Sequence, residues 1–158
     1  MFPVQIHLAL NHIPLTGLAF GLVFYVFGIK RLSEAELLIG ERIFVAMGAI
    51  SILIVASGLR SAHALVPAQW LDASAVHSHQ RAGTLTLILI MLLGILSGII
   101  LVRSRGGPKV GFVRLRRAIL LLAIVSFGIV LWTSKLGGEL RHNELRSRSQ
   151  TASFSTHR

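Results

Sequence analysis

Four long apolar stretches follow one another along the chain, and polar or charged residues separate them. They cover approximately residues 8–29, 43–59, 82–102 and 118–134. A helix needs about 20 mostly apolar residues to cross the hydrocarbon core of a bilayer. The pattern therefore predicts an all-α protein, an up-and-down bundle of four transmembrane helices with both termini on the same side. Residues 1–145 form the predicted membrane domain, and 146–158 a polar tail that we expect to be flexible.

Small residues and prolines within these stretches refine the prediction. Gly17-x-x-x-Gly21 and Gly94-x-x-x-Gly98 predict faces on which another helix or a flat ligand can approach closely. Pro14 either begins a regular helix or kinks one that starts earlier, which leaves the backbone before it partly unpaired. The Gly137-Gly138 pair predicts that the last helix ends there.

Composition supports a membrane protein and excludes several kinds of site. The chain is 53% apolar and 14% charged, which is more apolar and less charged than a soluble domain. It has no cysteine, so disulfides, thiolate metal sites, iron–sulfur clusters and covalently attached haem are excluded. The net charge is +10, and the basic residues lie in the connections between the spans. This placement indicates that they orient the protein in the membrane and contact anionic lipid, rather than bind nucleic acid.

The distribution of basic residues predicts the orientation. The connections at 30–42 and 103–117 hold three and six lysines and arginines, and the opposite face has fewer in its short segments. By the positive-inside rule these two connections are cytoplasmic and both termini are outside. The first stretch lacks the features of a cleaved signal peptide, so we expect it to be retained. We expect a multi-pass protein of a bacterial inner membrane.

The histidines are distributed unevenly under this threading. Six of the seven fall on the periplasmic face and none in either cytoplasmic connection: His7, His12, His63, His77, His79 and His142. Their gathering at one face is the main functional signal of the sequence, because histidine within or beside a membrane span is a functional candidate.

A haem b site explains this cluster. A helix bundle can hold haem between facing helices by two neutral imidazoles, with room for the ring and cations for the propionates. We expect His12 and His79 to be the axial ligands of the iron. His63, His77 and His142 would be alternative ligands or serve a second site. The candidate cations are Arg60, Arg81, Lys135 and Arg141.

Other interpretations remain open at this stage. His12 can bond a freed backbone carbonyl, and His77 and His79 can be ordinary polar residues at a helix start. The chain could be a cofactor-free accessory subunit that docks through its small-residue faces, or it could bind copper or zinc. No hydrolase motif is present. The expected partners are the bilayer, membrane or periplasmic redox subunits, and quinone.

Three motifs also carry a resemblance. They are Leu10-Asn11-His12-Ile13-Pro14-Leu15-Thr16-Gly17, His79-Gln80-Arg81-Ala82, and Trp132-Thr133-Ser134-Lys135-Leu136-Gly137-Gly138-Glu139-Leu140-Arg141-His142-Asn143-Glu144-Leu145. The chain up to Leu145 resembles a family of uncharacterised four-helix bacterial membrane proteins. The resemblance implies the fold and the importance of His12, His79 and His142. Gln80 stands where that family has an acid, which argues against a proton relay there. The architecture is similar to b-type cytochrome subunits.

Overall fold

The computed structural model describes residues 5, 7, 9–65, 73–104 and 112–141. Four helices account for most of them: α2 (Ile13–Arg31), α3 (Glu34–Leu65), α4 (Ala73–Arg103) and α5 (Val113–Arg141). All four are long and apolar enough to cross a membrane. The predicted all-α bundle is confirmed, and the chain is a multi-pass membrane protein. The predicted tail lies outside the described residues.

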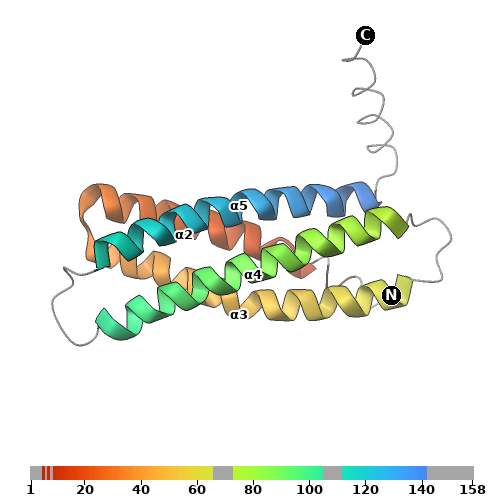
Figure 1. The fold of residues 1–158 in the computed structure, drawn as a ribbon, viewed down its shortest axis with the longest axis horizontal. Coiled ribbons are helices and arrows are strands. Elements are labelled where there is room, and N and C mark those ends of the chain that lie inside the picture. The colour runs from red at the N-terminus through yellow and green to blue at the C-terminus, as the bar shows by residue number, and fades with distance from the viewer. Residues whose placement is uncertain (1–4, 6, 8, 66–72, 105–111, 142–158) are drawn as a thin grey trace, which may run out of the picture.

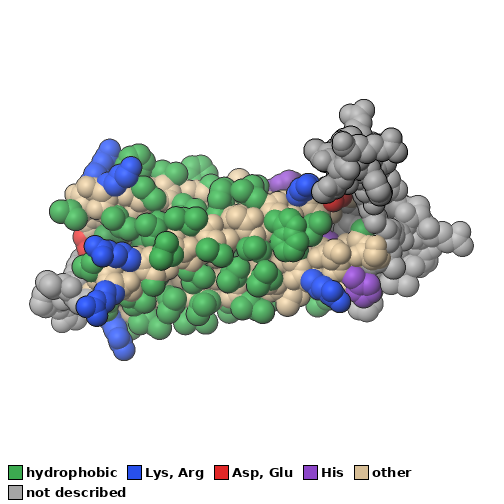
Figure 2. All heavy atoms as spheres, turned by 45° about the horizontal axis from the view of Figure 1, so that its top comes forward, with side chains coloured by type: hydrophobic (Ala, Val, Ile, Leu, Met, Phe, Trp, Pro, Cys, Tyr) green, Lys and Arg blue, Asp and Glu red, His purple; other side chains and the backbone are tan. Residues whose placement is uncertain are grey.

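The helices run alternately up and down (Figure 1). Contacts join α2 to α3, α3 to α4, α4 to α5, and α5 back to α2, so α3 and α5 lie diagonally across the bundle. We call the end at which α3 and α5 finish and α4 begins the histidine end. The opposite end, at which α3 and α5 begin, is the basic end. In Figure 2 apolar side chains cover the surface between the two ends, while lysines and arginines cluster at both.

Helix α2 begins one residue before Pro14. Pro14 stands in the first turn of α2 and His12 is the N-cap residue, with no hydrogen bond from its side chain to the helix. Pro14 was expected either to begin a regular helix or to kink one that starts earlier. In the structure it stands at the start of α2. At its other end α2 stops at Leu32, whose φ of 54° is left-handed. Leu32 and Ser33 are the only residues between α2 and α3, so most of the predicted connection at 30–42 is helical.

Helices α3, α4 and α5 extend past the predicted spans. The expectation that Gly137-Gly138 ends the last helix is wrong, because α5 continues through both glycines to Arg141. Glu139, Leu140 and Arg141 are favourable helix residues, and Gly137 lies against another helix rather than in a turn. Glycine in a helix interior costs only about 1 kcal/mol relative to alanine, which the neighbouring residues and contacts can offset.

Glycines allow the helices to approach closely inside the bundle. A Cβ atom at Gly94 would lie 3.3 Å from the Cα of Gly48, and one at Gly21 would lie 2.5 Å from the Phe44 ring. Contacts this short leave no space for a side chain. The small-residue faces predicted on the first and third spans are therefore largely used within the chain, around a core that includes Leu18 and Phe44.

Candidate functional site

His7 lies just before α2 and packs against α3. Its carbonyl accepts the N–H of Asn11 at 2.9 Å, so the chain makes one helical turn before the break at His12. The His7 Nδ1 atom lies 3.1 Å from the Ser57 hydroxyl oxygen. The face of α3 beside it is glycine: a Cβ at Gly58 would lie 3.0 Å from His7 Cε1. The imidazole is half-buried because glycine leaves space for it.

The hydrogen bonds around Ser57 favour one tautomer of His7. The Ser57 hydroxyl oxygen lies 2.7 Å from the carbonyl oxygen of Ile54, to which it can donate its single proton. In that arrangement the hydroxyl accepts from His7, so Nδ1 carries the proton and Nε2 has the lone pair. Burial lowers the pKa of His7, with the Ile54 carbonyl acting weakly in the opposite sense. His7 is thus a neutral imidazole with Nε2 available as a ligand.

His79 occupies the equivalent depth on α4 and faces α5. A Cβ at Gly137 would lie 3.0 Å from His79 Cε1, so this imidazole also packs on a glycine. Its Nδ1 atom is buried and has no hydrogen-bond partner in the described part of the chain. The Thr133 carbonyl is near the ring, but it does not satisfy Nδ1 with normal hydrogen-bond geometry.

A pair of threonines lies farther into the bundle from His79. The Thr133 hydroxyl oxygen lies 2.8 Å from the carbonyl oxygen of Ile129 and 2.9 Å from the Thr86 hydroxyl oxygen, with which it shares a hydrogen bond. This bond joins α4 to α5 directly beneath the histidine. It helps to hold the two helices at a fixed spacing on either side of the imidazole.

His7 and His79 are close enough to interact electrostatically. One comes from the segment before α2 and the other from α4, which are diagonal elements of the bundle. Two half-buried imidazoles therefore lie at the histidine end, each against a glycine of a different helix. This pair is the candidate site.

The other predicted residues are placed differently. The structure does not bring His12 together with His79, because His12 caps α2 and its side chain is exposed. The side chains of His77, Arg60, Arg81 and Lys135 are also exposed at this end. Lys135 Nζ lies 3.7 Å from Glu139 Oε1, in an exposed pair along the helix. The side chains of His63 and Arg141, and all of His142, lie outside the described residues.

A sequence signal for His7 exists in the spacing of α2. Its buried residues are Pro14, Leu18, Gly21, Tyr25 and Gly28, a stripe with alternating intervals of four and three. Continued backward from Pro14 by seven residues, the stripe reaches His7, whereas His12 is out of register. A period of 3.5 residues is the pattern of helices packed along a common seam.

A second buried polar cluster lies at the basic end and was not expected from the sequence. Arg116 of α5 bonds both oxygens of Glu34, at 2.8 and 2.5 Å. Its Nε also contacts Glu41 at 3.2 Å. Glu41 and the adjacent Tyr25 are 0% exposed. The sequence signal was Glu34 and Glu41, which are seven residues apart and thus on one helix face, but the sequence did not indicate the arginine they would meet.

Comparison with known proteins adds no assignment. No family model, curated protein or solved structure matches the chain. The interpretation of function therefore depends on the geometry of the histidine pair.

Proposed function

We propose that this protein is an integral membrane subunit that binds haem b between His7 and His79 and transfers electrons at the histidine end. The observation that supports this most is the placement of two half-buried imidazoles, from diagonal elements of the bundle, at the same end of the molecule. Bundles build cofactor sites in this way, from side chains on facing helices. By the positive-inside rule the histidine end is periplasmic in a bacterial inner membrane.

The number of ligands favours haem over a bare metal ion. Structural zinc sites have four protein ligands, and catalytic zinc sites have three. In the described residues no group of three or more histidines, cysteines or acids is placed to hold a metal. Haem iron already has four porphyrin nitrogens as ligands, so one imidazole on each side of the ring would complete its coordination. Two histidines suit haem, and are too few for zinc.

The surroundings of each imidazole support the role of a ligand. The Ser57 hydroxyl bonds the Nδ1 atom of His7 and helps to orient the ring, as partners of metal-binding histidines usually do. The two rings pack directly against the backbone at Gly58 and Gly137, where no side chain intervenes. Arg60, Arg81 and Lys135 are exposed around this end and would pair with the propionates. When bound, haem would supply one-electron chemistry, and a neighbouring redox subunit or quinone would be the partner.

Absorption spectroscopy of alanine variants tests the proposal. We expect the purified protein to show a b-type band in a reduced-minus-oxidised spectrum, with one haem per chain. His7→Ala and His79→Ala should each abolish the band. His12→Ala and His77→Ala are matched controls at the same end, and should retain it because these side chains are exposed. A colourless wild-type protein, or loss of the band in His12→Ala but not in His7→Ala, would refute the proposal.

The geometry gives less support to a cofactor-free accessory subunit. That function requires small-residue faces free for docking to a larger complex. Gly17 and Gly21 instead lie against Met47 and Phe44, and Gly94 lies against Gly48. These three glycines are covered by the chain itself, and of the two glycine pairs Gly98 alone lies at the outer surface.

A further inference from the structure

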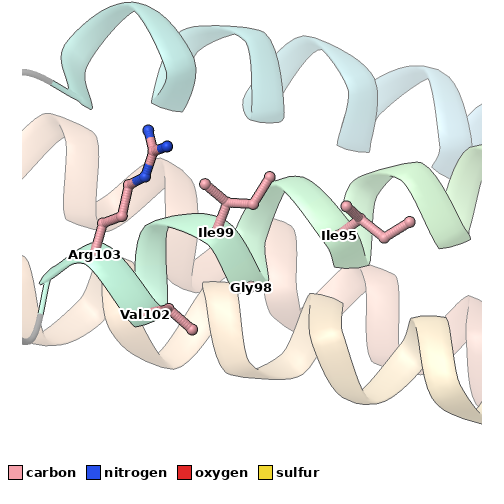
Figure 3. A pocket seen from close by; sticks show the side chains of 5 residues that line it. All are labelled: Ile95, Gly98, Ile99, Val102 and Arg103. Atoms are coloured by element: carbon pink, nitrogen blue, oxygen red, sulfur yellow. The ribbon is translucent and has the colours of Figure 1, made fainter.

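An open groove runs along the outer surface of α4 toward the basic end (Figure 3). It is lined by Ile95, Gly98, Ile99, Val102 and Arg103. Its volume is about 400 Å³, and it is open to the outside. The surface is hollowed at Gly98 because this residue has no side chain. A Cβ atom at Gly98 would lie 3.7 Å from Val45 Cγ2, which is an ordinary contact distance, so the position has space for a side chain. The groove is therefore a depression in the membrane-facing surface and does not lie in the core.

The walls of the groove are apolar and exposed. Ile95 is 55% exposed and Val102 is 68% exposed, and both lie within a helix that is apolar enough to cross a membrane. Side chains of this kind in such a position face the hydrocarbon of lipid. An aliphatic chain is the complementary surface for a groove of isoleucine, valine and glycine.

One end of the groove carries a positive charge. Ile95, Ile99 and Arg103 follow one another at intervals of four, and in Figure 3 they point to the same side of α4. The nine residues from Ile95 to Arg103 extend about 12 Å along the helix axis. Arg103 is the last residue of α4, is exposed, and makes no hydrogen bond or ion pair to any other described residue.

We propose that the groove binds one acyl chain of an anionic phospholipid, with the lipid phosphate held by Arg103. The guanidinium group forms bidentate bonds to phosphate, and its place at the helix end is the depth at which headgroups lie. A second copy of the chain fits less well, because it would bring two such basic ends together unless it lay antiparallel. This site is independent of the haem proposal.

Native mass spectrometry of the detergent-purified full chain tests the site. Dioleoylphosphatidylglycerol and dioleoylphosphatidylcholine would be titrated separately. We expect the first to bind about fivefold more tightly, since one basic residue near a membrane surface is worth about 1 kcal/mol. Arg103→Gln should remove this preference. Arg117→Gln, which removes an exposed cation at the same end outside the groove, should leave it intact.

A second pair of variants tests the apolar part of the groove. Gly98→Leu fills it and should weaken binding of both lipids. Gly128→Leu adds the same side chain at an exposed glycine of α5 with no atom within 4 Å of its Cβ position, and should not. Equal effects of Arg103→Gln and Arg117→Gln would overturn the proposal, as would unchanged binding to Gly98→Leu. A dimer of the wild type that Gly98→Leu dissociates would place a second copy in the groove and would also overturn it.

Discussion

The hydroxyl group of Ser57 favours one nitrogen of His7 as the available one. When it donates to Ile54, it accepts from Nδ1. The sequence pointed to histidines at this end of the bundle, and from it we expected His12, rather than His7, to be a ligand. The choice depends on the register of α2, in which Pro14 starts the helix and leaves His12 outside the buried stripe. His79 could be anticipated from its place just before the third apolar stretch.

Removal of the Ser57 hydroxyl should weaken haem binding without unfolding the protein. We expect Ser57→Ala to lower haem affinity about 10- to 100-fold, the usual loss when a partner of a metal-bound histidine is removed. Haem titration of the apoprotein measures this. Ser51→Ala serves as the control, because the buried Ser51 hydroxyl bonds only to the Gly48 carbonyl of its own helix. If both variants lose affinity equally, the proposed role of Ser57 is wrong.

Acidification should destabilise the apoprotein through His7. Burial lowers the pKa of His7 in the folded protein, while in the unfolded chain it keeps the ordinary value of about 6.5. The unfolded state therefore binds more protons, and the free energy of unfolding falls as pH drops through and below 6.5. Thermal melts in detergent from pH 8 to pH 5 should show a smaller decline for His7→Gln than for the wild type. An identical pH dependence would contradict this assignment.

At the scale of the element, helix α5 contains two adjacent glycines with different surroundings. Gly137 faces His79, and a Cβ atom at Gly137 would lie only 3.0 Å from His79 Cε1. Gly138, by contrast, has no atom within 4 Å of its Cβ position. From sequence alone the pair indicated a helix end. Glycine is used both where a helix stops and where two elements come close together. Only the position of His79 opposite Gly137 separates the two meanings.

Alanine substitutions at these two positions should have different effects. Gly138→Ala should stabilise α5 by about 0.5–1 kcal/mol, because alanine is the better helix residue and no contact opposes it. Gly137→Ala gains the same propensity but pushes the His79 ring by a few tenths of an ångström, and should weaken haem binding. Thermal melts and visible spectra of both variants would measure these effects. Equal haem content in the two variants would show that Gly137 does not position His79.

At the scale of the whole molecule, the ionic cluster at the basic end connects helices that otherwise have few contacts. Arg116 on α5 reaches the two acids on α3, which lies diagonally across the bundle. The four apolar stretches were enough to predict the bundle, because each is long enough to cross the bilayer. They did not predict this cluster, because Glu41 and Arg116 lie near predicted span boundaries, where charged residues ordinarily face water.

Loss of the cation should destabilise the bundle strongly. Arg116→Leu leaves the fully buried Glu41 carboxylate without its guanidinium partner, which typically costs about 3–5 kcal/mol. The double variant Arg116→Leu/Glu41→Leu should be closer to the wild type, because no unpaired charge remains at that position. Unfolding in detergent followed by circular dichroism measures both. Arg117→Leu is the exposed control and should change stability by less than about 0.5 kcal/mol. A double variant as unstable as Arg116→Leu would contradict the expected coupling.

The same ionic cluster has a consequence for biogenesis. Glu41 and Arg116 are 75 residues apart in the chain, and the arginine lies on α5, which is synthesised after α2, α3 and α4. The hairpin of α2 and α3 therefore leaves the ribosome with a carboxylate whose cation does not yet exist. Final closure of the bundle must wait until α5 has been made, so a nascent chain truncated before Arg116 should remain open and be recognised by membrane quality control.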